Sequence, residues 1–322
     1  MYLVTLLYAL LLLLDHSLAG FDPRSKTNLA VYWGQNSVDS HALNVAQGRL
    51  VDYCHDPNVD IILLAFLITI TDGQGNFKPV LNFANQAPRC DQSKRPYTCP
   101  EVEEDIRTCQ LDKKKTILLS FGGFTSPEAG FNDDNKARVA AQKLWEMFGP
   151  PTSDPPDSGR PFGKSVVDGF DFDFEREVPG MGVFGQELHK LMGGENKRGR
   201  LITAAPQCPI PVQDSMFNQI PLDIVFVQFY NNPQCSYNFK EWNDWATGRK
   251  ARWFVGLPGS QRAGAGYIEP GDALNDIFRK AKEFDRMGGA MLWDASQAWS
   301  NNNYHVAVKK ALTGAKMEPF QG

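Results

Sequence analysis

A short apolar run, followed by a turn and often by an amphipathic helical pattern, recurs eight times along the chain. The runs have the length and the aliphatic and aromatic content of buried strands, and the helical patterns between them fit right-handed βα crossovers. The runs lie at residues 28–33, 59–68, 116–121, 167–175, 200–205, 223–230, 252–257 and 289–294. Helical candidates in the connections are residues 42–54, 137–148, 180–192 and 271–287. This alternation predicts an α/β protein of the (β/α)8 TIM-barrel type.

The start of the chain has the pattern of a secretory signal. An apolar run from Tyr2 to Leu14 is followed by Ser17-Leu18-Ala19, a small-x-small cleavage pattern. The run is too short to span a bilayer comfortably, and no later stretch resembles a membrane span. We therefore expect residues 1–20 to be a signal peptide and residues 21–322 to be a single (β/α)8 catalytic domain. These features predict a secreted, extracellular protein without a membrane anchor. Association with a cell wall is one location compatible with this prediction.

Charge, histidine spacing and cysteine content limit the kinds of partner, cofactor and compartment that this protein can have. The formal net charge of -4 argues against nucleic acid, and the run Lys113-Lys114-Lys115 is better explained as a solvated helix end. The five histidines show no spacing typical of metal ligands, so we expect neither a metal nor a cofactor. Six cysteines are typical of an oxidising compartment and could form three disulfides. The spacing of the cysteines does not determine which of them pair. A monomer is the default expectation.

The segment DGFDFDFE, residues 168–175, carries most of the chemistry. In a strand Asp171, Asp173 and Glu175 share one face, and the phenylalanines between them share the other. A solvated edge strand is the ordinary explanation for such a pattern, but a closed barrel has no edge. Three carboxyls inside a barrel cost several kcal/mol, which indicates a functional site, with Glu175 nearest the carboxyl end. Asp168 has the opposite parity, and we assign it a structural role at the start of the strand.

Other strands bring further polar and aromatic side chains inward. In the run 223–230, Gln228 and Tyr230 share one face, although a buried Gln and Tyr can also simply satisfy each other. Tyr32 has the inward parity of the first run, and the eighth run ends in Trp293-Asp294. Aromatic rings at a barrel mouth suit the flat faces of sugars, while most tryptophans in a barrel serve packing.

Several motifs match a known family. They are DGFDFDFE against the pattern DxxDxDxE, together with VYWGQN, LLSFGG, TAAPQCP, VQFYNNPQC and MLWDAS. On these motifs, spread over nearly the whole mature chain, the protein resembles the family 18 glycoside hydrolases, and within them the plant-type class III chitinases of the hevamine kind and their fungal relatives. The resemblance implies the disulfides Cys54–Cys109, Cys90–Cys99 and Cys208–Cys235.

The position of Asp173 makes an ordinary second carboxylate hard to place. It lies one pleat below Glu175, roughly 7 Å away along the strand, so both acids approach a sugar from the same side. The resemblance implies substrate assistance, in which the sugar's acetamido oxygen attacks its own anomeric carbon to give an oxazolinium ion that water opens with retention.

The same resemblance implies a role for each inward residue. Glu175 is expected to be the general acid and then the base. Asp173 is expected to hold the acetamido N–H, Asp171 to share a proton with Asp173, and Tyr230 to donate to the acetamido oxygen. Trp293 is expected to form the floor under that sugar, with Tyr32 and Gln228 binding around it.

These expectations describe a retaining endochitinase that cleaves the β-1,4 bonds of chitin and chito-oligosaccharides. One alternative is an endo-N-acetylglucosaminidase or a lysozyme-like hydrolase. Another is a non-catalytic chitin-binding lectin or an inhibitor on the same fold, although such relatives typically lose the terminal acid of the motif and Glu175 is present. A barrel enzyme acting on other substrates is disfavoured, because the sequence has neither phosphate loops nor metal-ligand spacing.

Overall fold

The computed structural model describes residues 20–38, 46–91, 98–154, 159–196, 199–234 and 237–316. All but the last residue of the predicted signal peptide, and Cys235 of the third implied disulfide, lie outside these ranges. Within them, no helix has the length and apolar character needed to cross a membrane.

Eight parallel strands close into a barrel, which confirms the predicted (β/α)8 fold. Neighbouring strands follow the order β1-β9-β8-β7-β6-β5-β4-β2, and the pairing of β1 with β2 closes the ring. The barrel strands are β1 (Asn28–Trp33), β2 (Ile61–Thr71), β4 (Thr116–Gly122), β5 (Gly169–Asp173), β6 (Leu201–Ala204), β7 (Ile224–Gln228), β8 (Arg252–Pro258) and β9 (Met287–Trp293). Each falls on one of the eight apolar runs, at most three residues beyond its predicted ends.

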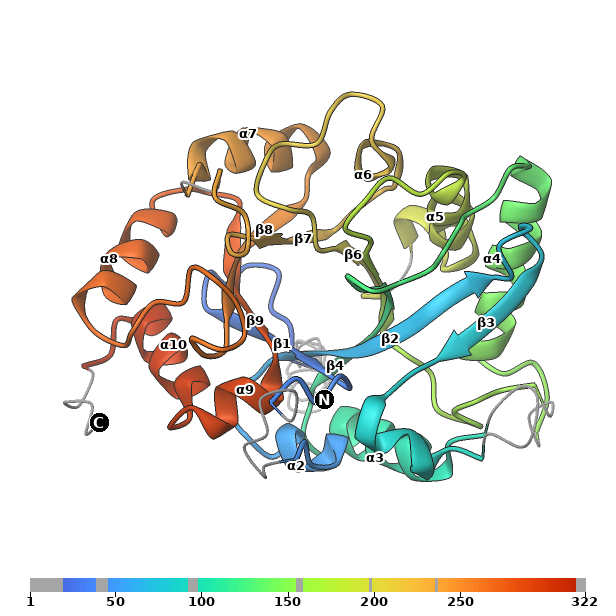
Figure 1. Ribbon diagram of the computed structural model, residues 1–322, viewed down its shortest axis with the longest axis horizontal. Coiled ribbons are helices and arrows are strands. Elements are labelled where there is room, and N and C mark those ends of the chain that lie inside the picture. The colour runs from blue at the N-terminus through green and yellow to red at the C-terminus, as the bar shows by residue number, and fades with distance from the viewer. Residues whose placement is uncertain are drawn as a thin grey trace, which may run out of the picture.

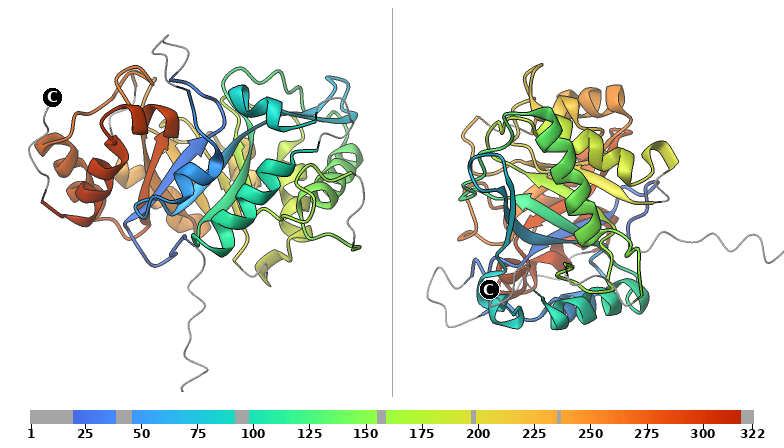
Figure 2. Two further views of the ribbon diagram at one scale, coloured as in Figure 1. Left: turned by 90° about the horizontal axis from the view of Figure 1, so that it is seen from below. Right: turned by 90° about the vertical axis from the view of Figure 1, so that its right-hand side faces the viewer.

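Helices surround the strands in Figure 1, and the two turned views of Figure 2 show the same outer layer. The α-helices are α2 (Leu50–Cys54), α3 (Pro100–Leu111), α4 (Asp134–Phe148), α5 (Met181–Leu191), α6 (Met216–Gln219), α7 (Phe239–Arg249), α8 (Asp272–Ala281), α9 (Ala295–Ser300) and α10 (Tyr304–Thr313). The described residues also form two 3₁₀ turns, η3 (Ala84–Arg89) and η4 (Gly194–Asn196).

The hydrophobic core has two parts, one inside the barrel and one between the barrel and the helices. The inner part contains Tyr32, Leu63 and Phe226, with other inward residues of the same strands. In the outer part, Phe170 and Phe172 of β5 pack on Phe121 of the neighbouring strand β4. The phenylalanines of the acidic strand therefore face the helices, as the alternation predicts.

Three local features differ from the sequence-based expectations. The helix predicted over 271–287 ends at Ala281, because the chain must turn before β9 begins at Met287. Of the helix predicted over 42–54, the described part begins only at Leu50. Strand β3 (Phe77–Leu81) was not predicted; it pairs antiparallel with the end of β2, which extends beyond the barrel.

Candidate active site

The lowest acid of β5, Asp171, is completely buried and accepts three hydrogen bonds from hydroxyl groups. Its Oδ2 accepts from Tyr32 at 2.8 Å and from Ser120 at 2.6 Å, and its Oδ1 accepts from Thr203 at 2.6 Å. These donors come from three other strands, β1, β4 and β6. Burial raises the pKa of Asp171, and the hydroxyl hydrogen bonds oppose that rise. Asp171 is thus held rigidly beneath the next acid.

Asp173 lies one pleat higher, at the end of β5, and is also buried. Its Oδ1 accepts a hydrogen bond from Gln228 Nε2 at 3.0 Å. Burial, together with the charges of Glu175 and Asp171, raises the pKa of Asp173 well above its usual value. Asp171 lies beneath Asp173 on the same face of β5, and its charge contributes to that rise. That Asp171 shares a proton with Asp173 stays a prediction.

Glu175 follows the strand, and its side chain is open to the cavity and to solvent. Its Oε2 accepts a hydrogen bond from Gln207 Nε2 at 3.1 Å, and the same Nε2 lies 3.1 Å from Gln228 Oε1. Partial burial of the carboxyl raises the pKa of Glu175, while the hydrogen bond from Gln207 lowers it. The result is an acid with a raised pKa at the mouth of the barrel.

The end of β7 provides a donor beside these acids. Gln228 is buried, and its Nε2 also donates to the Ala205 carbonyl at 2.9 Å, which fixes the orientation of the amide. Tyr230 is 5% exposed, and burial together with the charges of Asp173 and Glu175 raises its pKa well above its usual value. Its hydroxyl therefore stays protonated and available to donate.

Trp293 ends β9 and faces the same space. Its ring packs against Phe66 at 5.9 Å between centroids, with 21° between the planes, and against Tyr32 at 5.4 Å. These contacts hold the indole so that it forms part of the cavity wall.

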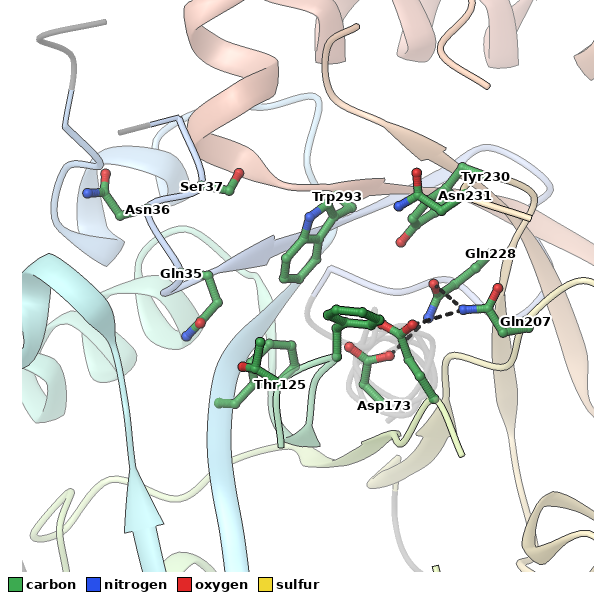
Figure 3. A pocket seen from close by; sticks show the side chains of 13 residues that line it. Gln35, Asn36, Ser37, Thr125, Asp173, Gln207, Gln228, Tyr230, Asn231 and Trp293 are labelled. Atoms are coloured by element: carbon green, nitrogen blue, oxygen red, sulfur yellow. Dashed lines mark hydrogen bonds between the residues drawn. The ribbon is translucent and has the colours of Figure 1, made fainter. Parts of the chain in front are cut away.

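These side chains surround a cavity of about 690 Å³, large enough for more than one sugar ring. The predicted residues Asp173, Glu175, Gln228, Tyr230 and Trp293 all line it. In Figure 3, Gln207, Gln228, Tyr230 and Asn231 lie on one side of Trp293, and Gln35, Asn36 and Ser37 lie on the other.

Two predicted residues lie below the cavity. Tyr32 was expected to bind substrate, but it is 1% exposed and its hydroxyl donates to Asp171, so it is not part of the cavity lining. Asp171 is likewise in the layer beneath. Asp171 therefore acts on the site through its charge beside Asp173, and Tyr32 through its ring contact with Trp293.

Several lining residues had no role in the sequence-based interpretation. Gln207 lies in the motif TAAPQCP, but it follows the end of β6, where strand alternation no longer predicts which way a side chain points. Phe66 would point outward by parity, and it lines the cavity because the register of β2 against β4 shifts between Ala65 and Leu67. The remaining lining residues are Gln35, Asn36, Ser37, Phe124, Thr125 and Asn231, all in loops that follow strands.

Asp168 lies away from the cavity. Its Oδ2 accepts from the Ile117 backbone N–H and from Gln110 Nε2, each at 2.8 Å. The carboxylate thereby connects the beginning of β4 to helix α3.

Two of the implied disulfides are present, Cys54–Cys109 and Cys90–Cys99. Cys208 is also disulfide-bonded, and its expected partner Cys235 is outside the described residues. Cys208 follows β6, so its bridge belongs to the loops at the carboxyl end of the barrel. Within the described ranges, no group of three or more His, Cys, Asp or Glu side chains is placed to hold a metal ion.

An acid with a raised pKa, a second carboxyl beside it and a tyrosine donor, at the carboxyl ends of barrel strands, form the kind of site that glycoside hydrolases use. The sequence model of the glycosyl hydrolases family 18 matches residues 28–265. The chain belongs to this family and is a glycoside hydrolase.

Known proteins are similar over nearly the whole chain. Endochitinase 33 of Trichoderma harzianum is 40% identical over 96% of this chain and 99% of its own length. Among solved structures, a chitinase from Ipomoea carnea has a TM-score of 0.71 at 28% identity, covering 88% of this chain and 99% of that one. A xylanase and α-amylase inhibitor protein from Scadoxus multiflorus has a TM-score of 0.70 at 28% identity, covering 90% and 99%. The fold is thus shared by proteins named as enzymes and as inhibitors.

Proposed function

We propose that the protein is a secreted endochitinase that hydrolyses β-1,4 bonds between N-acetylglucosamine units with retention of configuration. One observation carries the mechanism: of the described residues that line the cavity, only Asp173 and Glu175 have carboxyl groups, and they are one pleat apart on the same strand end. Neither can attack a sugar from the face opposite the leaving group, so the nucleophile has to come from the substrate.

In the first step, protonated Glu175 gives its proton to the glycosidic oxygen. The acetamido carbonyl oxygen of the sugar over Trp293 forms a bond to the anomeric carbon as the bond to the leaving oxygen breaks. The products of this step are an oxazolinium ion, a shortened chain with a free hydroxyl, and ionised Glu175.

Tyr230 and Asp173 assist the same step from fixed positions. The Tyr230 hydroxyl donates to the acetamido oxygen and orients it for attack. Asp173 accepts the acetamido N–H, and its negative charge stabilises the positive charge that develops on the ring. The hydrogen bond from Gln228 keeps the Asp173 carboxyl oriented before the substrate arrives. Asp171 is held beneath Asp173 by its three hydroxyl donors, and its charge helps to raise the Asp173 pKa.

In the second step, ionised Glu175 removes a proton from water. The water oxygen attacks the anomeric carbon from the side that the leaving group vacated, and the oxazolinium ring opens. Two inversions give a product with the β configuration, and Glu175 is protonated again.

The similarity to an inhibitor protein makes a non-catalytic role the main alternative. The presence of Glu175, its raised pKa and its position on the cavity favour an enzyme. The partners that follow are chitin and chito-oligosaccharides. Secretion rests on the signal-peptide pattern of residues 1–20 and on the presence of disulfides.

Product analysis tests this assignment. Purified protein is incubated in parallel with an acetylated chitin oligomer, peptidoglycan and a β-linked N-glycan, and products are identified by mass spectrometry. We expect internal cleavage of the chitin oligomer at the highest rate. Faster cleavage of peptidoglycan or of the N-glycan would replace the assignment with a lysozyme-like or endo-N-acetylglucosaminidase activity, and cleavage of none would favour a lectin or an inhibitor.

A further inference from the structure

Phe124 is the most exposed large apolar side chain among the residues that the structure describes, with 84% of its surface open to solvent. The other exposed large apolar residues in these ranges are Leu111, Val139 and Val212, and none of them lines the cavity. Phe124 does line it, together with Asp173 and Glu175. An exposed aromatic ring costs solubility and contributes little to folding, so its place beside the candidate catalytic acids points to binding.

The turn that carries Phe124 is fixed to its surroundings. Phe124 and Thr125 are the central residues of a turn closed by the hydrogen bond from Ser126 N to the Gly123 carbonyl, at 3.0 Å. Gly123 N donates to the Asp173 carbonyl at 2.8 Å, and Ser126 Oγ donates to the Ile68 carbonyl at 2.7 Å. The turn is therefore attached to β5 on one side and to β2 on the other.

Two glycines allow this close approach. Gly123 has a φ of +87°, and a Cβ there would lie 2.6 Å from the Phe66 ring. Gly122 has a φ of +100°, and a Cβ there would lie 2.6 Å from the Asp173 carbonyl oxygen. The backbone before Phe124 consequently lies flat against the aromatic ring and the strand end, which a residue with a side chain would prevent.

A second anchor follows the turn. Glu128 is fully buried, and its carboxylate accepts from Ile70 N at 2.5 Å, Thr71 N at 3.0 Å and Gly130 N at 2.7 Å. The guanidinium of Arg176, the residue after Glu175, donates to the Glu128 carbonyl. The loop that presents Phe124 is thus tied to the chain on both sides of the cavity before any ligand binds, so little ordering is needed on binding.

The aromatic rings of the cavity gather on one part of its wall, where the polar residues Gln35, Asn36, Ser37 and Thr125 also lie. Phe66, Phe124 and Trp293, which follow or belong to β2, β4 and β9, supply rings on one part of the ring of strands. The β5, β6 and β7 ends supply the hydrogen-bonding groups of Asp173, Glu175, Gln207, Gln228, Tyr230 and Asn231. A pyranose with equatorial substituents has flat apolar faces and a polar edge. The aromatic rings suit the faces, and the polar side chains around them suit the edge.

We propose that Phe124 is a sugar-binding platform that stacks on the apolar face of an N-acetylglucosamine ring in the chain, other than the ring held over Trp293. This inference rests on the proposed function. Because the ring is exposed in the free protein and would be covered only in the complex, its burial contributes to affinity for longer chains and not to folding. Phe124 is then a specificity-determining residue that favours polymeric substrate.

Binding is measured by calorimetry in the Glu175→Gln background, so that substrate is not consumed, with a hexamer of N-acetylglucosamine as the probe. We expect Phe124→Ala to weaken binding about fivefold to tenfold, the effect of losing one aromatic stacking contact. Phe124→Trp should retain the parent affinity. Leu111→Ala is the matched control, because Leu111 is 58% exposed at the end of α3, which leads into the opposite end of the barrel. The thermal midpoints of all variants should agree.

The outcomes separate this inference from the proposed function. If the Glu175→Gln parent binds the hexamer and Phe124→Ala binds it within twofold of the parent, the platform is wrong and the proposed function stands. A Trp variant as weak as the Ala variant, or a lower thermal midpoint for Phe124→Ala, would also overturn the platform. If the parent does not bind the hexamer at all, the proposed function fails and the platform fails with it.

Discussion

Gln207 Nε2 donates a hydrogen bond to Glu175 Oε2 across 3.1 Å, and this bond favours the ionised form of the acid. It opposes the burial that raises the Glu175 pKa. Since the proposed first step needs protonated Glu175, activity should fall as pH rises through this pKa. We predict that Gln207→Ala, which removes the bond, moves the alkaline limb of the kcat/KM profile to higher pH.

The profile is measured on a short chitin oligomer, with Gln186→Ala as the control, since Gln186 is exposed on α5. An alkaline limb that stays in place in Gln207→Ala, or moves to lower pH, would contradict the role assigned to this hydrogen bond.

Glu175→Gln preserves the size of the side chain and removes its transferable proton. We predict a loss of at least ~100-fold in kcat with chitin binding retained. Glu283→Gln is a suitable control, because Glu283 lies just after α8 with 66% of its side chain exposed. Near-normal turnover in Glu175→Gln would remove Glu175 from the mechanism.

Ionisation of buried Asp173 is expected to lower the free energy of unfolding at neutral pH. Its pKa is raised in the folded protein, chiefly by burial, so the unfolded chain releases this proton at lower pH than the folded chain does. Between the two pKa values the folded state holds more protons, and its stability falls as pH rises. Asp173→Asn keeps an oxygen that accepts from Gln228 and removes the ionisation.

We therefore predict that Asp173→Asn is at least ~100-fold less active but unfolds at an equal or higher temperature at pH 7, with a smaller decline in stability from acidic to neutral pH. Thermal unfolding across pH measures this. A clearly lower midpoint for the variant at pH 7 would mean that the ionised carboxylate stabilises the fold.

The two described disulfides should contribute unequally, because they close loops of different length. Cys54–Cys109 spans 55 residues and Cys90–Cys99 spans 9. The loop-entropy relation gives about 4 kcal/mol for the first and about 2.5 kcal/mol for the second. Denaturant unfolding of the Cys54→Ala/Cys109→Ala and Cys90→Ala/Cys99→Ala variants measures both losses, and a larger loss for the short bridge would contradict this order.

The barrel and the stack of acids were predictable because both depend on strand periodicity. Alternation places Asp171 and Asp173 inside and the phenylalanines outside wherever the chain remains a regular strand. The same rule does not hold at Phe66, where the strand register shifts, and it gives no direction to Gln207 or Phe124, which follow strand ends.

Tyr32 shows a second limit. Parity correctly points it inward, but parity does not report depth, and Tyr32 lies a layer below the cavity with its hydroxyl committed to Asp171. Depth depends on the stagger of neighbouring strands in the closed barrel, which pairs Tyr32 with Leu63 of β2. Strand stagger is a property of the tertiary structure that no single run of residues encodes.

The central claim is that the substrate's own acetamido group is the nucleophile, and a fully deacetylated oligomer tests it most directly. The oligomer is incubated with the enzyme beside its acetylated counterpart, products are followed by mass spectrometry, and the first anomer formed is identified by early-time NMR. We predict that the deacetylated oligomer binds the acidic cavity but is not cleaved, and that the acetylated oligomer gives β product first. Comparable hydrolysis of the deacetylated oligomer, or α product appearing first, would contradict substrate assistance by way of Asp173 and Tyr230.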